Sequence, residues 1–336
     1  MRRVRTVLLG VVLVVAAGCG LTLLAFSSDM NSARAAISGK SDLAQTTSGP
    51  IEYVDVGTGI PLLTIHGAGG GFDQGLANGE AMFGPGFRMI APSRFGYLRT
   101  PVPADVSPAA QAEAHVALLD ELGVSRPVVL GVSAGARSAL EMALRHPERT
   151  RALVLVVPAT YAPDTVAPAT QRGADFPLML WLVNAGADFA WWTLQHMAPD
   201  MITSFLGVPP EVVRAAAPDD QAAVAAMIRS ILPLSERYAG INIDSTPPLA
   251  ALALDSLDVP TLIISARDDL FDTLPPAEYA AARIPGARLV TFETGGHLLV
   301  GHRDEVRAAI ADFLAQAGIA GNSLPTHVPL RRLTSP

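Results

Sequence analysis

Short apolar segments alternate with amphipathic segments along most of the chain. Apolar runs of strand length recur from residue 61 to residue 265, and helical spacing of apolar residues lies between them. Buried strands that alternate with amphipathic helices indicate an α/β fold, with a mostly parallel, doubly wound sheet covered on both faces. We assign residues 50–158 and 257–318 to this core domain. The expected strands are 51–56, 61–66, 88–91, 127–132, 152–157, 261–265 and 288–292, and the expected helices are 107–122, 134–146, 276–284 and 304–316.

One long segment interrupts this alternation. Residues 159–256 contain no clear strand and are helical in composition. A structureless loop of that length is improbable in a compact domain, so we predict a helical cap inserted over the edge of the sheet. The expected cap helices are 176–190, 191–197, 211–217 and 221–231.

The N-terminal segment has a different pattern, because three arginines precede an apolar run from residue 7 to residue 26. About 20 residues of helix cross a bilayer, and basic residues at the start place the body outside the cell. Residues 1–30 are therefore expected to be an export signal or a transmembrane anchor, which leaves the body secreted or held at the cell membrane. Cleavage after Ala33-Arg34-Ala35 and lipidation of Cys19 are the alternatives to an uncleaved anchor. We expect a flexible linker at 31–49 and a loose C-terminal tail at 319–336.

Composition and charge narrow the possible chemistry. The 336 residues are 50% hydrophobic and carry a net charge of −7 with scattered basic residues, so we expect no nucleic-acid partner. Cys19 is the single cysteine, which excludes an intramolecular disulfide and a zinc–thiolate site. Lys40 is the single lysine, which excludes a phosphate-binding loop lysine and a pyridoxal-phosphate Schiff base in the folded body. We expect no cofactor and no metal.

A G-x-S-x-G pentapeptide at 131–135 lies between an expected strand and an expected helix. A nucleophile in this position sits on a strained turn, and the small residues on either side let neighbouring backbone approach closely. Ser133 is therefore the candidate nucleophile. The alternative interpretation is a serine that only caps the following helix.

The glycine-rich sequence HGAGGG at 66–71 follows an earlier expected strand. Attack of a serine on an ester creates an oxyanion that needs unobstructed backbone N–H donors, and such a loop provides them. We expect one donor from Ala68 or Gly69 and the other from Ala134, the residue after the nucleophile. A dinucleotide-binding loop is excluded because the third glycine of G-x-G-x-x-G is missing in either register.

A serine nucleophile needs a base, and the base needs a carboxylate that orients it. His297 follows two glycines after the expected strand 288–292 and is the candidate base, with His302 as its nearest rival. Asp269 follows the expected strand 261–265 and is the candidate acid, with Asp268 as the alternative. Sites form at the carboxyl ends of parallel strands, which is where these residues lie.

The sequence resembles the α/β-hydrolase fold family from about residue 49 to residue 318. The motifs that carry the resemblance are HGAGGG at 66–71, GVSAG at 131–135, RHPERTRALVLV at 145–156, VPTLIISARDD at 259–269 and GGH at 295–297. Residues 92–97 depart from the family because they lack the acidic residue that often precedes R-x-G-x-G, and Ala266 replaces the usual glycine before the acid. The resemblance implies the α/β-hydrolase fold and a cap that covers the active site.

Large apolar side chains in the cap suit the lining of an apolar substrate pocket, although they are also suited to packing the cap on itself. The residues expected at the pocket are Trp181, Trp191, Trp192, Met197 and Phe205. The expected function is that of an exported serine hydrolase, which cleaves a small to medium apolar ester or lactone through an acyl-enzyme. The alternatives are a C–C bond hydrolase or cofactor-free perhydrolase on the same triad, and a non-catalytic binding member of the fold. The expected partner is a small ester-like molecule, together with the membrane if the N-terminal segment is uncleaved.

Overall fold

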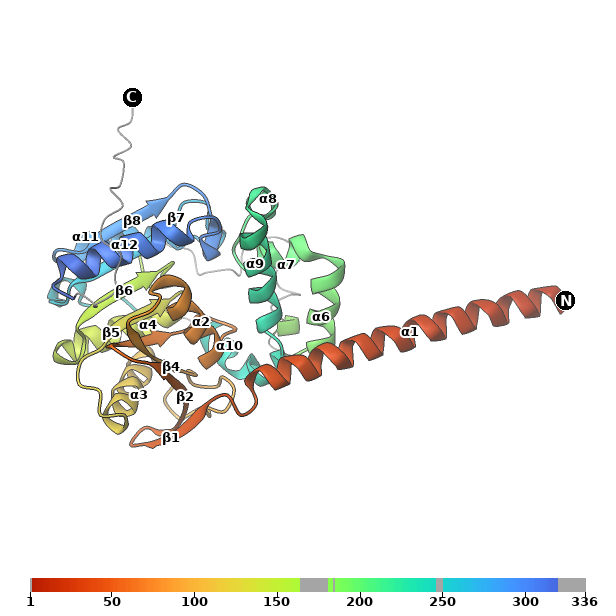
Figure 1. Cartoon of the computed structure of the whole chain (residues 1–336), viewed down its shortest axis with the longest axis horizontal. Coiled ribbons are helices and arrows are strands. Elements are labelled where there is room, and N and C mark those ends of the chain that lie inside the picture. Colours follow the sequence, from red (N-terminus) through yellow and green to blue (C-terminus); the bar gives the residue numbers. More distant parts are fainter. Residues whose placement is uncertain (1, 164–180, 184, 246–249, 320–336) are drawn as a thin grey trace, which may run out of the picture.

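An eight-stranded sheet runs through the body of the protein (Figure 1). The computed structural model describes residues 2–163, 181–183, 185–245 and 250–319. The strand order is β1-β2-β4-β3-β5-β6-β7-β8, in which β2 pairs antiparallel with both β1 and β4 and all other neighbours are parallel. This order confirms the mostly parallel sheet expected from the apolar runs. The strands are β1 (Asp42–Thr46), β2 (Gly49–Gly57), β3 (Ile60–Ile65), β4 (Phe87–Pro92), β5 (Val128–Val132), β6 (Ala152–Val156), β7 (Thr261–Ala266) and β8 (Arg288–Phe292).

Helices cover both faces of the sheet because successive strand residues point to opposite sides. In β5, Val129 packs in one apolar cluster with helices α3, α4 and α11, whereas Val128 and Leu130 pack in another with α12. Both clusters are fully buried, so the central strands are apolar on both faces, which is why they read as continuous apolar runs. The covering helices are α2 (Phe72–Met82), α3 (Pro108–Glu121), α4 (Gly135–Arg145), α11 (Leu274–Arg283) and α12 (Arg303–Gln316), and a 3-10 turn, η1 (Pro147–Arg149), follows α4.

Helix α2 was not expected from the sequence, because its two glycines weaken the helical pattern. The fold requires them. A Cβ atom on Gly75 would lie 2.8 Å from the carbonyl oxygen of Thr64, and one on Gly79 would lie 2.9 Å from the Thr64 methyl group. The glycines let α2 lie directly on β3, immediately after the glycine-rich loop.

All helices and strands that the structure describes in the insertion between β6 and β7 are helices (Figure 1). Its helices α6, α8 and α9 agree with the expected helices 191–197, 211–217 and 221–231 to within a few residues. Of the expected helix 176–190, residues 176–180 and 184 lie outside the described residues, and the last three residues belong to α6. The elements of the insertion are α6 (Asp188–Met197), α7 (Pro199–Phe205), α8 (Pro210–Ala215), α9 (Pro218–Ser230), η2 (Leu234–Glu236), α10 (Tyr238–Ser245) and η3 (Leu254–Ser256). We call residues 159–256 the cap.

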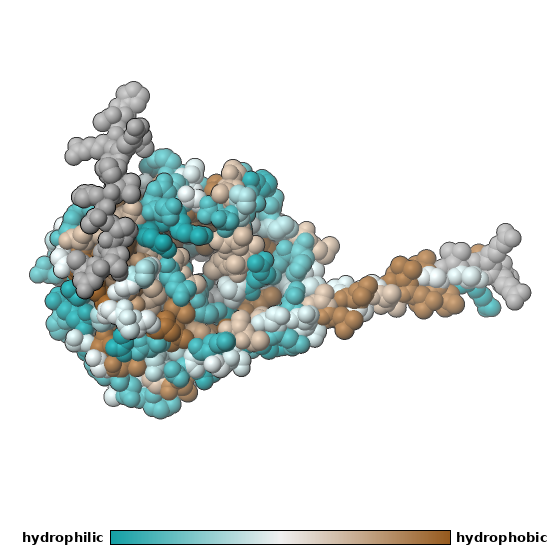
Figure 2. All heavy atoms as spheres, viewed as in Figure 1, coloured by the Kyte–Doolittle hydropathy of each residue, from teal (hydrophilic) through white to brown (hydrophobic). Residues whose placement is uncertain are grey.

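The N-terminal helix α1 (Arg2–Ile37) projects from the body, and its projecting part is apolar (Figures 1 and 2). It is long and apolar enough to cross a membrane, with a mean hydropathy of 2.7 over its most apolar window. Its last turns pack on the cap, where Met30 is 2% exposed.

The expected flexible linker at 31–49 is therefore wrong in this structure. Residues 31–37 continue α1, and β1 pairs with β2 at the sheet edge. Burial of Met30 and Ile37 together with strand pairing orders a stretch whose composition resembles a linker. Of the expected C-terminal tail, only Ile319 is described, and it is buried in the core.

Candidate active site

Ser133 lies on the tight turn between β5 and α4, as the G-x-S-x-G spacing predicts. Its φ angle of 52° is in the left-handed region, which is strained for a residue with a side chain. Two glycines make this turn possible. A Cβ atom on Gly135 would lie 2.4 Å from the carbonyl oxygen of His66, and one on Gly131 would lie 2.6 Å from the Cβ of Ala139.

We expect Gly135→Ala to lower the free energy of unfolding by about 1–3 kcal/mol, because the new methyl group overlaps a backbone oxygen that cannot move freely. Urea denaturation measures the change. Gly20→Ala is the control, because a Cβ there meets nothing within 4 Å. Equal stability of the two variants would contradict the close approach at the turn.

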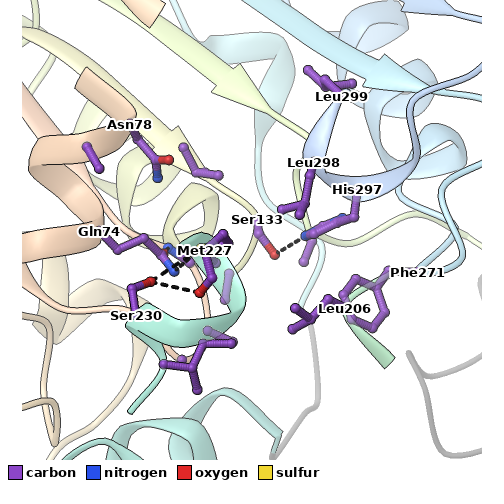
Figure 3. Close-up of a pocket in the computed structure, with 18 of the residues that line it drawn as sticks. Gln74, Asn78, Ser133, Leu206, Met227, Ser230, Phe271, His297, Leu298 and Leu299 are labelled. Atoms are coloured by element: carbon purple, nitrogen blue, oxygen red, sulfur yellow. Dashed lines mark hydrogen bonds between the residues drawn. The ribbon is translucent and has the colours of Figure 1, made fainter. Parts of the chain in front are cut away.

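Ser133, His297 and Asp269 form a continuous hydrogen-bonded row, although they come from three separate loops. Figure 3 shows the contact between Ser133 and His297. The Ser133 Oγ lies 2.8 Å from His297 Nε2, and His297 Nδ1 lies 2.8 Å from Asp269 Oδ2. An ionised carboxylate only accepts hydrogen bonds, so Nδ1 carries the proton of a neutral ring. Nε2 is then the acceptor for the serine hydroxyl, which is the arrangement that a general base needs.

Asp269 is buried, and three groups around it favour its ionised form. Burial alone would raise its pKa, but the His297 ring and hydrogen bonds from His297, Thr273 Oγ1 and the Phe271 N–H hold the pKa below its ordinary value. A carboxylate in this state can orient the His297 ring and stabilise positive charge on it.

Asp268, the alternative acid, has a different place. Its carboxylate accepts hydrogen bonds from the N–H groups of Gly295 and Gly296, at 3.1 and 2.8 Å. It therefore holds the loop that presents His297, without contacting the ring. His302, the rival base, stacks on Phe292 at the start of α12.

The structure distinguishes between Ala68 and Gly69, the two expected oxyanion donors in the glycine-rich loop. The Gly69 N–H donates to the Tyr97 hydroxyl at 3.3 Å, so it is already engaged. Within the described residues, the N–H groups of Ala68 and Ala134 form no hydrogen bond, and both residues line the same pocket as Ser133. Ala68 and Ala134 are thus the pair that can receive an oxyanion.

A buried polar network supports this loop and was not expected from the sequence. His66 Nδ1 donates to Gly67 O at 2.7 Å, and His66 Nε2 accepts from the Arg94 N–H at 2.9 Å. Burial lowers the pKa of His66 well below its ordinary value, so the ring is neutral and structural. Arg94 in turn forms a bidentate ion pair with Asp244 of α10, with a 2.5 Å contact. These partners lie far apart in sequence, so no local motif signals them.

A largely apolar cavity of about 760 Å³ adjoins Ser133, between the core and the cap (Figure 3). Of the five cap residues expected to line it, Trp191 and Phe205 do so. The other three do not. Trp181 and Met197 are 64% and 80% exposed, and Trp192 packs on Phe26 and donates to Asp29 of α1.

Other residues, which no sequence motif indicates, also line the cavity. Gln74 of α2 lies near Ser133 and accepts a hydrogen bond from Gly67 N–H, and Met227 of α9 faces it (Figure 3). In the described part of the chain, no cluster of three or more His, Cys, Asp or Glu side chains is placed to hold a metal ion.

Comparison with known proteins agrees with this geometry. Residues 60–302 match the α/β hydrolase fold family. The chain is 29% identical to a 2-hydroxymuconate semialdehyde hydrolase of Pseudomonas putida, over 78% of this chain and 90% of that one. It is 30% identical to a putative carbamate hydrolase of Klebsiella pneumoniae, over 76% and 92% of the two chains.

Among solved structures, an α/β hydrolase fold protein from Nakamurella multipartita is 30% identical, with a TM-score of 0.65 over 83% of this chain and 99% of that one. The motifs that carry the resemblance and the strands β3 to β8 lie within the residues that match the family. The chain therefore belongs to the α/β-hydrolase fold family.

Proposed function

We propose that this protein is a serine hydrolase that cleaves an ester of a largely apolar acid. The observation that carries the proposal is the hydrogen-bonded row from Ser133 through His297 to Asp269, which opens onto an apolar cavity. A binding protein of the same fold would need the cavity but not the row. The row also distinguishes Ser133 from a serine that only caps a helix.

The proposed reaction has two halves. The Ser133 Oγ attacks the ester carbonyl while His297 Nε2 takes its proton, and the N–H groups of Ala68 and Ala134 bind the oxyanion. Collapse of the tetrahedral intermediate expels the alcohol, which leaves with the proton held by His297. Water, activated by the same ring, then attacks the acyl-enzyme and releases the acid and the free serine.

A fluorophosphonate probe tests the nucleophile directly. We expect it to label the folded protein at Ser133 alone, as read by peptide mass spectrometry, and to abolish hydrolysis of p-nitrophenyl esters. Failure of the folded protein to react would support the non-catalytic alternative, because the probe needs an activated serine.

Hydrolysis of a C–C bond next to a carbonyl is the second candidate. It is favoured by the relatives, because the Pseudomonas putida protein is named as a 2-hydroxymuconate semialdehyde hydrolase. The same three side chains would serve, with a carbon leaving group in place of the alcohol. Parallel assays of 2-hydroxymuconate semialdehyde and of p-nitrophenyl esters, compared by kcat/KM, separate the two candidates.

We further propose that α1 remains attached as a membrane anchor. Cleavage after Ala35 would remove the turns that pack on the cap, including buried Met30 and the hydrogen bond from Trp192 to Asp29. The intact mass of the protein recovered from the membrane fraction tests this, because cleavage would remove a predictable mass.

We expect Met30→Ala to destabilise the cap by about 2–5 kcal/mol, because it removes a buried side chain from the apolar cluster around Trp191. Thermal unfolding in detergent measures the change. Leu24→Ala is the control, since Leu24 lies in the same helix but is 69% exposed. An unchanged Met30→Ala protein would argue that α1 does not contribute to the folded body.

A further inference from the structure

One corner of the pocket holds the positive charge of Arg137, which has no carboxylate partner among the described residues. Arg137, in the first turn of α4, lines the same cavity as Ser133. Its Nε donates to the carbonyl oxygen of Ala159 at 2.9 Å, and its Nη1 donates to the carbonyl oxygen of Asp244 at 3.1 Å. Both acceptors are neutral backbone oxygens. Among the described residues, no carboxylate forms an ion pair with Arg137.

Asp244, the carboxylate that attracts Arg137, already has other partners. Asp244 Oδ1 accepts from Arg94 at 2.9 Å, and Asp244 Oδ2 accepts from Arg94 and from the Tyr97 hydroxyl, both at 2.5 Å. The buried Arg94 and the partly buried Arg137 therefore share one carboxylate, and Arg94 holds it. Burial lowers the pKa of Arg137 from its ordinary value despite the attraction of Asp244, which indicates a poorly solvated charge.

A second polar group in this corner also lacks a partner. The Thr160 hydroxyl is buried, lines the cavity, and forms no hydrogen bond within the described chain. Thr160 follows Ala159, whose carbonyl binds Arg137 and whose N–H donates to the Ser133 carbonyl at 3.1 Å. The Arg137 guanidinium and the Thr160 hydroxyl thus lie on either side of Ala159, which is hydrogen-bonded to the backbone of Ser133. Buried polar groups without partners are uncommon in native proteins, and a ligand is one explanation.

The other arginine in the pocket lining makes the contrast clear. Arg303 also lines the cavity, but it is about half exposed and pairs with Asp220. Its charge is therefore hydrated and balanced. Arg137 differs on both counts.

We propose that Arg137 and Thr160 form a subsite for a carboxylate of the substrate, so that this protein acts on carbonyl compounds that carry an apolar chain and one carboxylate. This inference rests on the proposed hydrolase function. Guanidinium groups bind carboxylates through charge-assisted hydrogen bonds, which strengthen in a site that excludes water. The remaining cavity wall is apolar, which suits the chain that joins the carboxylate to the carbonyl.

Matched pairs of esters test the subsite. The mono-p-nitrophenyl esters of glutaric, adipic and suberic acid are compared with p-nitrophenyl esters of the monocarboxylic acids of equal length. We expect the wild type to have a higher kcat/KM for the charged member of at least one pair. Arg137→Gln should lower kcat/KM for that ester by about 10- to 100-fold while leaving its neutral partner little changed. Arg303→Gln, the control, should keep the wild-type preference.

Binding without turnover separates failure of the subsite from failure of the proposed function. Titration calorimetry measures adipate binding to Ser133→Ala and to Ser133→Ala with Arg137→Gln, and we expect binding only to the first. If no ester is hydrolysed but adipate binds in this way, the subsite stands and the proposed ester activity fails. If esters are hydrolysed and the neutral member is preferred at every length, or if Arg137→Gln lowers both members equally, the subsite is overturned.

Discussion

Ser133→Ala is expected to lower kcat for ester hydrolysis by about a million-fold, to the background rate of the assay. The alanine removes the atom that attacks the carbonyl, and water in its place would lack the positioning that the turn provides. Steady-state assays with p-nitrophenyl esters measure the loss, and burst kinetics show whether an acyl-enzyme still forms.

Ser230→Ala is the matched control, because Ser230 lines the same cavity and its hydroxyl bonds to the Met227 carbonyl at 2.8 Å, not to His297 (Figure 3). We expect this variant to retain most of its activity. If Ser133→Ala keeps the activity and Ser230→Ala loses it, the assignment of the nucleophile is wrong.

Asp269→Asn is expected to lower kcat by about 10⁴-fold, as replacement of the carboxylate does in serine protease triads. The amide can donate a hydrogen bond to Nδ1, which places the ring proton on Nε2 and leaves no acceptor for the Ser133 hydroxyl. Asp268→Asn is the comparison, and a smaller loss is expected because the Asp268 carboxylate accepts hydrogen bonds from backbone N–H groups of the His297 loop and, within the described residues, none from the ring. A larger loss from Asp268→Asn would reverse the two roles.

The effect of Asp269→Asn on stability should depend on pH. Because the folded-state pKa of Asp269 is depressed, its ionised form stabilises the fold above the ordinary aspartate pKa of about 3.9, and this stabilisation is lost as the pH falls through the lower folded-state value. The stability difference between wild type and Asp269→Asn should therefore shrink in acid. Urea denaturation at neutral and at acidic pH measures it.

Much of the core could be predicted from the sequence because its signals are local. The strands β5, β6 and β7 are apolar on both faces, so each appears as an unbroken run. Helix α2 gave the opposite signal, since its glycines lower helix propensity but allow close packing on β3. Strand β1 was missed for a related reason: only one of its five residues is buried, so its pairing with β2 leaves little pattern.

By itself, the sequence determined the fold class and indicated the three side chains of the proposed reaction. Ser133, Asp269 and His297 each follow a buried strand, and a parallel sheet brings such positions to one edge. The tertiary structure alone decided which neighbours each group has. The Gly69 N–H donates to the Tyr97 hydroxyl, which leaves Ala68 as the proposed oxyanion donor of the loop.

The pocket was decided in the same way. Trp191 and Trp192 are neighbours in α6. Trp191 lines the cavity, whereas Trp192 packs against helix α1. Asp244 of the cap pairs with Arg94 of the core, and among the described residues that pairing leaves Arg137 with backbone acceptors and no carboxylate. Hydrogen bonds and burial at such sites join residues far apart in the chain, so only the folded arrangement determines them.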